Sequence, residues 1–217
     1  MPFRSAGLFL LLALLAGCGD SGAKSSYRST RGIYPEADFA ELAAAFHAGV
    51  ASNRPLAFET FPQSFIDARG VPVDLAKFRD TANVVLTVVK GLPQSPGGLY
   101  CPGCLAQMNS FGANVDGFKS RGAEVMVVFP GPSDSLNDFL VQAKAVPAEG
   151  KVGVPMLLDK DMAACRRLDI LGDWAKPSTY ILNTKGSVVY AYVGEGTTDR
   201  PSLKALFAEL DKLNVKK

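Results

Sequence analysis

The chain has 217 residues, a length that suits one core domain with extensions. Nearly half of the residues (47%) are hydrophobic, so the chain can bury a sizeable core. The formal net charge is only +2 and no run of like charges occurs, so we expect no nucleic-acid partner and no strongly acidic one. Four cysteines are too few for a disulfide scaffold.

The N-terminus has the features of an export signal. Arg4 supplies a positive charge, and residues 8–16 form an apolar run too short to span a bilayer as a mature helix. The stretch Leu15–Cys18 resembles the bacterial lipobox, which implies cleavage before Cys18 and lipidation of its thiol. We therefore expect a lipoprotein signal peptide over 1–17 and a lipid anchor in a membrane of the cell envelope, facing the periplasm. The alternative is a plain secretory signal with an incidental cysteine.

Two segments separate this signal from the main domain. Residues 18–35 are polar, small and serine-rich, as in a flexible tether. Residues 36–69 are expected to form an N-terminal extension with a helix over 36–50, where apolar side chains recur at helical spacing. The single histidine, His47, lies next to that apolar face. Because no second ligand lies near it, we expect no metal, and we expect no other cofactor.

Strands and helices alternate in the main domain, residues 70–217. Before it, residues 56–65 fit no single element and 67–70 form a predicted turn. Apolar runs typical of buried strands occur at 83–89, 123–129, 154–158 and 178–183. Helical spacing of apolar side chains is found over 104–121, 133–143, 162–169 and 201–213. A glycine-containing turn joins 178–183 to a further strand over 187–193. This order predicts an α/β domain with a central mixed sheet and helices on both faces.

The candidate active site is the pair Cys101 and Cys104, two cysteines separated by two residues between a strand and a helix. At a helix start the first thiol lies near unpaired N–H groups and the positive dipole end, which favours the thiolate. The second thiol lies one turn further on and can attack a mixed disulfide formed by the first. Pro102 suits the first helical position, where a missing N–H costs nothing. We predict Cys101 as the attacking thiolate and Cys104 as the resolving thiol.

Two other uses of this pair remain open. Half of a zinc site would need further cysteine or histidine ligands, and the sequence has one distant histidine. A structural disulfide between Cys101 and Cys104 would close a very short loop and so constrain the unfolded chain little. Cys165 stands alone on a predicted helix beside Ala163 and Leu168, which indicates a buried inert thiol, with a resolving role as the alternative.

Residues from about 70 to 213 resemble the thioredoxin superfamily and, within it, the AhpC/TSA peroxiredoxin-like group. The similar segments are the lead-in 70–75, the helix start 100–108, the proline segment 176–181, and a tail of the CPxC type over 192–195 and 198–202. The resemblance implies a thioredoxin-like three-layer α/β/α sandwich around a mixed sheet. It also implies redox chemistry at the cysteine pair.

The resemblance further implies residues that position a substrate. Pro177 corresponds to the family's cis-proline, which would present backbone groups to an incoming thiol or peptide. The alternative is an ordinary proline at a turn or strand edge. Pro102 and Tyr100 belong to the same expected set, and Trp174 is a further aromatic residue that would flank the site.

The sequence departs from a peroxiredoxin at two positions. A peroxiredoxin has Thr or Ser three residues before its peroxidatic cysteine, and with Cys104 in that role Cys101 occupies the Thr position. The family's arginine falls near Pro177, so we expect no arginine beside the cysteines. The loop 92–98 also looks longer than the family usually has, either as one wall of a groove or as a surface insertion.

Three functions follow. The first is exchange with protein thiols and disulfides, which the two departures favour. The second is a thiol peroxidase, with a peroxide substrate and a thiol reductant as partners. The third is a non-catalytic thioredoxin-fold binding module in which the cysteines form only a stabilising bridge.

Overall fold

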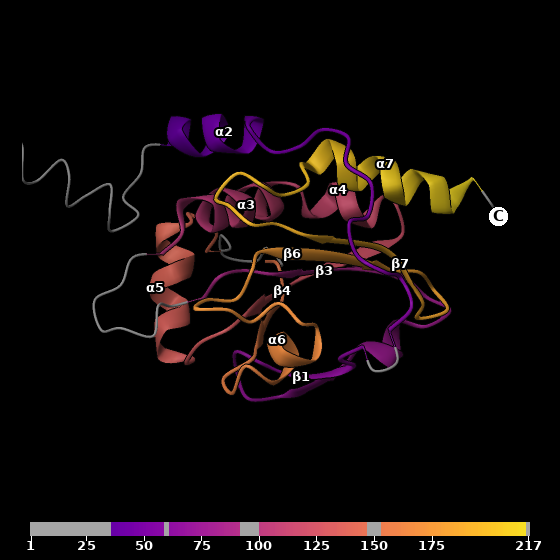
Figure 1. Ribbon diagram of the computed structural model, residues 1–217, viewed down its shortest axis with the longest axis horizontal. Coiled ribbons are helices and arrows are strands. Elements are labelled where there is room, and N and C mark those ends of the chain that lie inside the picture. The colour runs from indigo at the N-terminus through magenta and orange to yellow at the C-terminus, as the bar shows by residue number, and fades with distance from the viewer. Residues whose placement is uncertain (1–35, 59–60, 92–99, 147–152, 216–217) are drawn as a thin grey trace, which may run out of the picture.

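One mixed sheet forms the centre of the molecule (Figure 1). The computed structural model describes residues 36–58, 61–91, 100–146 and 153–215. Its strands are β1 (Ser64–Asp67), β2 (Pro72–Asp74), β3 (Asn83–Val88), β4 (Ala123–Phe129), β5 (Met156–Leu158), β6 (Ser178–Leu182) and β7 (Val188–Val193). They lie in the order β2-β1-β5-β4-β3-β6-β7.

The middle of this sheet is apolar because it is covered on both faces. β3 pairs with β4 in parallel and with β6 antiparallel, and all of its residues are buried. Successive side chains of a strand point to opposite faces. Val85 and Val89 therefore join one hydrophobic cluster, and Leu86 and Val88 join the other. The continuous apolar runs predicted as buried strands are confirmed.

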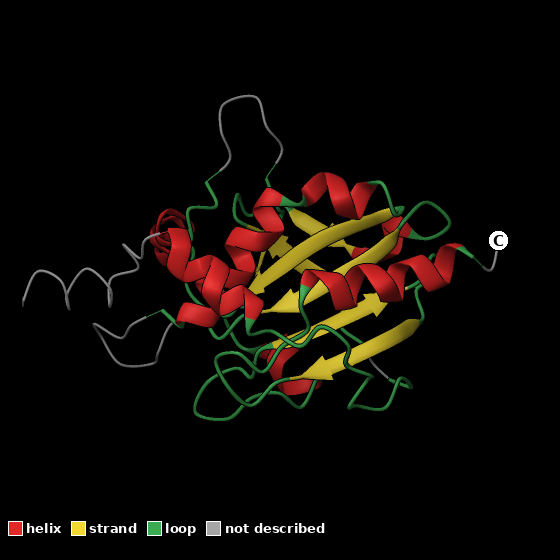
Figure 2. Cartoon of the chain, turned by 90° about the horizontal axis from the view of Figure 1, so that it is seen from above, coloured by secondary structure: helices red, strands yellow, loops and turns green. Residues whose placement is uncertain are grey.

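Helices complete the outer layers. They are α2 (Glu36–Ala44), the 3₁₀ turn η1 (Leu75–Phe78), α3 (Pro102–Ala113), α4 (Val115–Lys119), α5 (Asp134–Gln142), α6 (Ala163–Arg167) and α7 (Leu203–Asn214). Figure 1 shows α2, α3, α4 and α7 over one face of the sheet and α6 on the other. Figure 2, seen from above, shows the first of these layers lying across the strands. The expected α/β/α architecture with a central mixed sheet is confirmed.

Two predicted helices end earlier than their apolar spacing indicates. The helix expected over 104–121 breaks at Asn114, whose φ of −126° and ψ of 22° leave the helical region. The Asn114 side-chain amide donates to the Ser110 carbonyl and stabilises this break. The helix expected over 36–50 ends at Ala44, and the chain then turns and bends past His47, which forms an isolated bridge with Pro201.

Part of the ambiguous stretch is a strand. β1 pairs antiparallel with β5 on one side and with β2 on the other. The predicted turn between them is present, because the Asp67 carboxylate accepts the N–H groups of Arg69 and Val71, and Gly70 has a φ of +85°. A boundary at residue 70 would divide this hairpin, so the sheet begins at Ser64.

The predicted signal peptide and tether, with Cys18, lie outside the described residues, as does the loop 92–98. In the part of the chain that is described, no helix combines the length and apolarity needed to cross a bilayer.

Candidate active site

The two cysteines lie at the start of α3, as predicted. Cys101 is the N-cap residue with extended backbone angles, and Pro102 takes the first helical position. The Cys101 carbonyl accepts the N–H groups of Cys104 at 2.9 Å and Leu105 at 3.1 Å, which closes the first turn. This turn holds both thiols at the helix end where the dipole is positive.

The two thiols differ in burial. Cys104 is 1% exposed and belongs to the hydrophobic cluster beneath α3. Its sulfur accepts the backbone N–H of Lys90, which follows β3, at 3.3 Å. Cys101 is only partly buried. An incoming substrate therefore reaches Cys101 first, with Cys104 behind it.

An arginine contacts both sulfurs. Arg200 comes from the loop between β7 and α7 and is 1% exposed. Its Nη2 lies 3.7 Å from the Cys101 sulfur and 3.6 Å from the Cys104 sulfur. The expectation that no arginine lies beside the cysteines is therefore wrong. By the family resemblance this arginine falls near Pro177, whereas in the structure it comes from the segment 198–202.

Arg200 is held by neutral acceptors. Its Nη1 donates to Gln107 Oε1 at 2.7 Å, and its Nε donates to the Thr197 carbonyl at 3.0 Å. The second contact needs the glycine of the CPGC motif. A Cβ on Gly103 would lie 1.9 Å from the Thr197 oxygen, so only glycine lets this loop approach the helix.

The N-terminal extension holds the same loop from the other side. The His47 N–H donates to the Arg200 carbonyl and the His47 carbonyl accepts from Ser202, both at 2.9 Å. His47 Nε2 lies 2.9 Å from Asp199 Oδ1. The Phe46 ring centroid lies 5.7 Å from the Arg200 guanidinium. His47 thus has a structural role next to the site that its position in the sequence did not indicate.

Asp199 closes this network and is ionised in it. Its carboxylate accepts hydrogen bonds from the Tyr192 hydroxyl and the Glu195 N–H and contacts His47. Partial burial alone would raise the pKa of Asp199, but these hydrogen bonds outweigh it and hold the pKa below its ordinary value. The Asp199 carboxylate therefore contacts groups of its own loop region and His47, and it does not pair with Arg200.

The electrostatics separate the two thiols. A hydrogen bond from Cys104 is the strongest influence on Cys101, and with the positive charges of Arg200 and Lys90 it lowers the pKa of Cys101 to about 5 against the opposing effect of burial. Burial, followed by that same hydrogen bond, raises the pKa of Cys104 above its ordinary value. At neutral pH Cys101 is a thiolate and Cys104 a protonated thiol.

Two residues expected to position a substrate, Pro102 and Tyr100, lie at the start of α3. Pro102 begins α3, as predicted. Tyr100 is only 7% exposed, and its hydroxyl donates to the Ser135 carbonyl at 2.8 Å while its ring packs on Phe139. Burial is the main cause that raises the pKa of Tyr100. Tyr100 therefore packs the start of α3 against α5.

The cis-proline expectation is wrong. No peptide bond is cis among the described residues, and these include Pro177. Pro177 is buried, and its carbonyl accepts the Gly194 N–H at 2.8 Å, one step beyond the pairing of Ser178 with Val193. This hydrogen bond continues the β6–β7 ladder, so Pro177 is the strand-edge proline that was the alternative. It anchors the loop that carries Arg200.

Cys165 lies apart from the pair. It is fully buried in the cluster on the α6 side of the sheet, whereas Cys104 belongs to the cluster on the α3 side. Its backbone N–H donates to Asp159 at 2.9 Å, and burial raises the pKa of its thiol. This is the environment of an inert core thiol.

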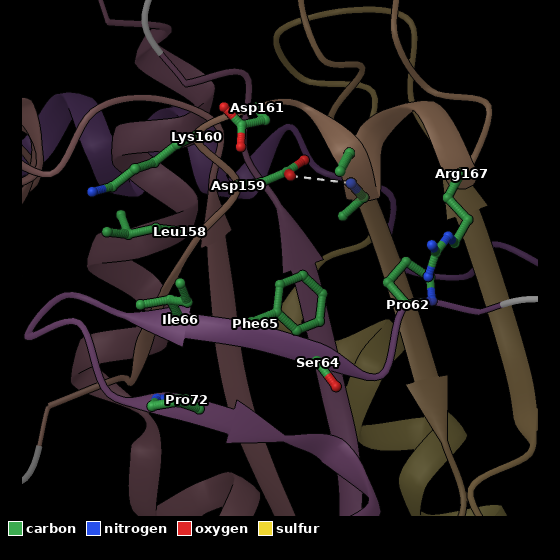
Figure 3. Close-up of a pocket in the computed structure, with 12 residues that line it drawn as sticks. Pro62, Ser64, Phe65, Ile66, Pro72, Leu158, Asp159, Lys160, Asp161 and Arg167 are labelled. Atoms are coloured by element: carbon green, nitrogen blue, oxygen red, sulfur yellow. Dashed lines mark hydrogen bonds between the residues drawn. The ribbon is translucent and has the colours of Figure 1, made fainter.

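Away from the cysteines, a pocket of about 450 Å³ lies between the β1–β2 hairpin, β5 and α6 (Figure 3). Its buried acid, Asp159, accepts the N–H groups of Ala164 and Cys165 at the start of α6. No cysteine side chain of the pair lines it. In the described ranges, no three His, Cys, Asp or Glu side chains gather as metal ligands would.

Solved structures share the fold. The bacterioferritin comigratory protein of Xanthomonas campestris is 19% identical, with a TM-score of 0.53 over 76% of this chain and 98% of that chain. A mitochondrial 2-Cys peroxiredoxin of Plasmodium falciparum is 15% identical, with a TM-score of 0.53 over 76% and 94%. Peroxidoxin BcpB of Mycobacterium tuberculosis is 17% identical, with a TM-score of 0.52 over 74% and 99%. Among curated proteins, none matches the sequence.

The profile of the AhpC/TSA family matches residues 57–191, more than half of the chain. This range contains the sheet from β1 to β6 and the helix start with both cysteines. It leaves out Arg200, which contacts both sulfurs, and His47, which holds the loop that carries Arg200. The chain belongs to the AhpC/TSA family and is a thiol-dependent oxidoreductase.

Proposed function

We propose that the protein exchanges thiols and disulfides through Cys101 and Cys104. The observation that carries this proposal is the difference between the two sulfurs, one a reachable thiolate beside Arg200 and the other a buried protonated thiol. Exchange needs such a pair, because the thiolate attacks first and the second thiol must wait for the mixed disulfide.

The reaction has two steps in the reducing direction. The Cys101 thiolate attacks one sulfur of a substrate disulfide, and the other substrate sulfur leaves as a thiolate. Cys104 then loses its proton and attacks the Cys101 sulfur, which releases the second substrate thiolate and forms the Cys101–Cys104 disulfide. Arg200, within 3.7 Å of both sulfurs, stabilises the negative charge as it moves between them.

A trapping experiment tests this assignment. The reduced Cys104→Ser variant, mixed with oxidised glutathione, should accumulate a mixed disulfide at Cys101, measured by mass spectrometry. Cys101→Ser should form none, and Cys165→Ser should behave as the unaltered protein. A Cys101→Ser protein that still consumes the disulfide at the normal rate would contradict the proposal.

A second candidate function is thiol peroxidase activity, which the position of Arg200 favours. The structure from Xanthomonas campestris was described for alkyl peroxide reduction, and this chain places an arginine beside its own thiolate. The sequence resemblance put Cys104 in the peroxidatic role, but the reachable thiolate is Cys101. Cys101 would therefore take one peroxide oxygen to become a sulfenic acid while the alcohol or water leaves with a proton. Cys104 would then condense with it, releasing water.

Peroxide and disulfide can be compared on the same Cys104→Ser protein. Rapid formation of a Cys101 sulfenic acid with micromolar hydrogen peroxide, trapped with dimedone, would support the peroxidase. Slow oxidation by peroxide together with rapid capture of glutathione would support exchange.

We also propose that the protein acts in the cell envelope, anchored through lipid on Cys18. The proposal rests on the export signal and on the lipobox-like stretch that ends at Cys18. A Cys18→Ser protein should move from the membrane fraction to the soluble fraction. Unchanged membrane fractionation would contradict the anchor without affecting the proposed chemistry.

A further inference from the structure

We infer that the buried guanidinium of Arg200 makes the Cys101–Cys104 disulfide a strong thiol oxidant, so that the site's substrates are dithiols of proteins or peptides. This inference rests on the proposed exchange function. It assigns a direction of electron flow, from the substrate to this protein.

Arg200 is a buried cation, and no carboxylate of the described residues pairs with it. It is 1% exposed, and its oxygen acceptors are the Gln107 side-chain amide and the Thr197 carbonyl, both neutral. Within the described residues it forms no ion pair. A buried charge is costly unless an opposite charge lies beside it. The anion within reach is the Cys101 thiolate, at 3.7 Å.

The nearby acids are engaged elsewhere. Asp199, the residue before Arg200, pairs with His47 and accepts from Tyr192 and Glu195. The Glu195 carboxylate pairs with Lys176 at 2.8 Å. On the other side of the cysteines Lys90 adds a further positive charge. Among the described residues, the charged side chains that act on Cys101 are Arg200 and Lys90, and both are cations.

The negative charge beside Arg200 differs between the two redox states. In the reduced protein the Cys101 thiolate balances the guanidinium. In the disulfide both sulfurs are neutral, and Arg200 keeps only dipolar partners and the Phe46 ring. The reduced state thus gains a stabilisation that the oxidised state lacks, and a stabilised reduced state makes a disulfide more oxidising.

The overall reaction balances with one proton released. The protein disulfide takes two electrons from a substrate dithiol, the substrate becomes a disulfide, and the protein becomes one thiolate at Cys101 and one thiol at Cys104. Of the two substrate protons, one ends on Cys104 and one goes to solvent. The protein disulfide is the oxidant, so this single turnover needs no other.

An equilibrium titration tests the inference on the full chain. The protein is equilibrated without oxygen in buffers of reduced and oxidised glutathione at pH 7, quenched with a maleimide, and its oxidised fraction is measured by mass spectrometry. The Cys101 pKa is measured separately, from thiolate absorbance of the same reduced proteins without glutathione or maleimide. For Arg200→Gln, the equilibrium constant for reduction at pH 7 should fall about tenfold, or about 30 mV in potential, for each unit by which the Cys101 pKa rises towards 7.

A second variant keeps the arginine in place. Gln107→Glu puts a carboxylate where the amide oxygen now lies 2.7 Å from Arg200 Nη1, so the guanidinium is balanced in both redox states. The equilibrium constant should fall in the same direction as in Arg200→Gln. The control is Arg121→Gln, which removes an arginine that pairs with Asp211 at 3.0 Å, away from the cysteines. It should leave the constant unchanged.

The outcomes separate the inference from the function on which it rests. If glutathione exchanges with the pair but both Gln107→Glu and Arg200→Gln leave the equilibrium constant unchanged, the inference is overturned and the exchange function stands. If the unaltered pair does not exchange with glutathione at all, the exchange function itself is wrong. Circular dichroism identifies any variant that has not folded, and the other variant then decides.

Discussion

At the scale of single residues, the site joins a cysteine pair at the start of α3 to Arg200, whose Nη2 lies 3.7 Å from the Cys101 sulfur. A strand, two cysteines and an amphipathic helix are adjacent in sequence, so local patterns indicate the helix start and the low pKa of Cys101. Arg200 lies almost a hundred positions further on, and its side chain arrives through a loop that folds back over Gly103. That contact is tertiary and leaves no periodic signal in the sequence.

The pH dependence of Cys101 alkylation tests the local charge balance. Because its pKa lies near 5, the rate with iodoacetamide should be level from pH 6 to pH 8 and fall as the thiolate is protonated below pH 5. Cys104→Ala removes the hydrogen bond that most lowers the pKa of Cys101, so the Cys101 alkylation rate in this variant should begin to fall at a higher pH. Cys104→Ser keeps a hydrogen-bond donor, so its alkylation profile should lie between those of the unaltered protein and Cys104→Ala. Identical profiles for all three proteins would contradict this account.

Gly103 gives a steric prediction with a control on the same helix. In Gly103→Ala the new Cβ meets the Thr197 carbonyl, so the loop with Arg200 must move, and overpacking of this kind costs about 1–3 kcal/mol of stability. The Cys101 alkylation profile should shift to higher pH at the same time. In Gly112→Ala the nearest atom is 3.7 Å away, so helix propensity should stabilise that protein by up to about 1 kcal/mol. Thermal unfolding of both variants measures the difference.

At the scale of elements, the long buried strands are more predictable from the sequence than the short strands and the ends of the helices. β3, β4 and β6 have continuous apolar runs, which indicate burial on both faces. β1 has four residues that alternate between exposed and buried, and its pairing with β5 depends on contacts distant in sequence. The break at Asn114 was missed because apolar spacing continues across it.

Phe46 links an element outside the family's matched range to the site. Its side chain is buried with the ring centroid 5.7 Å from the Arg200 guanidinium, and truncation of such a side chain costs about 3–5 kcal/mol. Phe46→Ala should therefore lower the thermal midpoint and also shift the Cys101 alkylation profile to higher pH, because Arg200 loses its packing partner. Leu56→Ala, at an exposed position, should change neither. A loss of stability with an unchanged profile would show that Phe46 supports the fold alone.

At the scale of the whole molecule, the active site is assembled from three separate parts of the chain. The family range supplies the cysteines, the segment after β7 supplies Arg200, and the N-terminal extension holds that segment through His47. A boundary drawn at residue 70 hides this, because the extension contributes both β1 and the His47 contacts. The architecture follows from local patterns, whereas the completed site depends on how these parts meet.

Removal of the extension tests this assembly. A chain that begins at Glu36 is compared with one that begins at Arg54, which lacks α2, Phe46 and the main-chain bridge between His47 and Pro201. The shorter chain keeps the sheet and both cysteines but frees one side of the loop that carries Arg200. We expect a lower thermal midpoint, Cys101 alkylation that falls off at a higher pH, and a weaker oxidant in the glutathione titration. If the shorter chain folds and keeps the profile of the longer one, the arginine is positioned by Gln107 and Thr197 alone, and the extension serves another purpose.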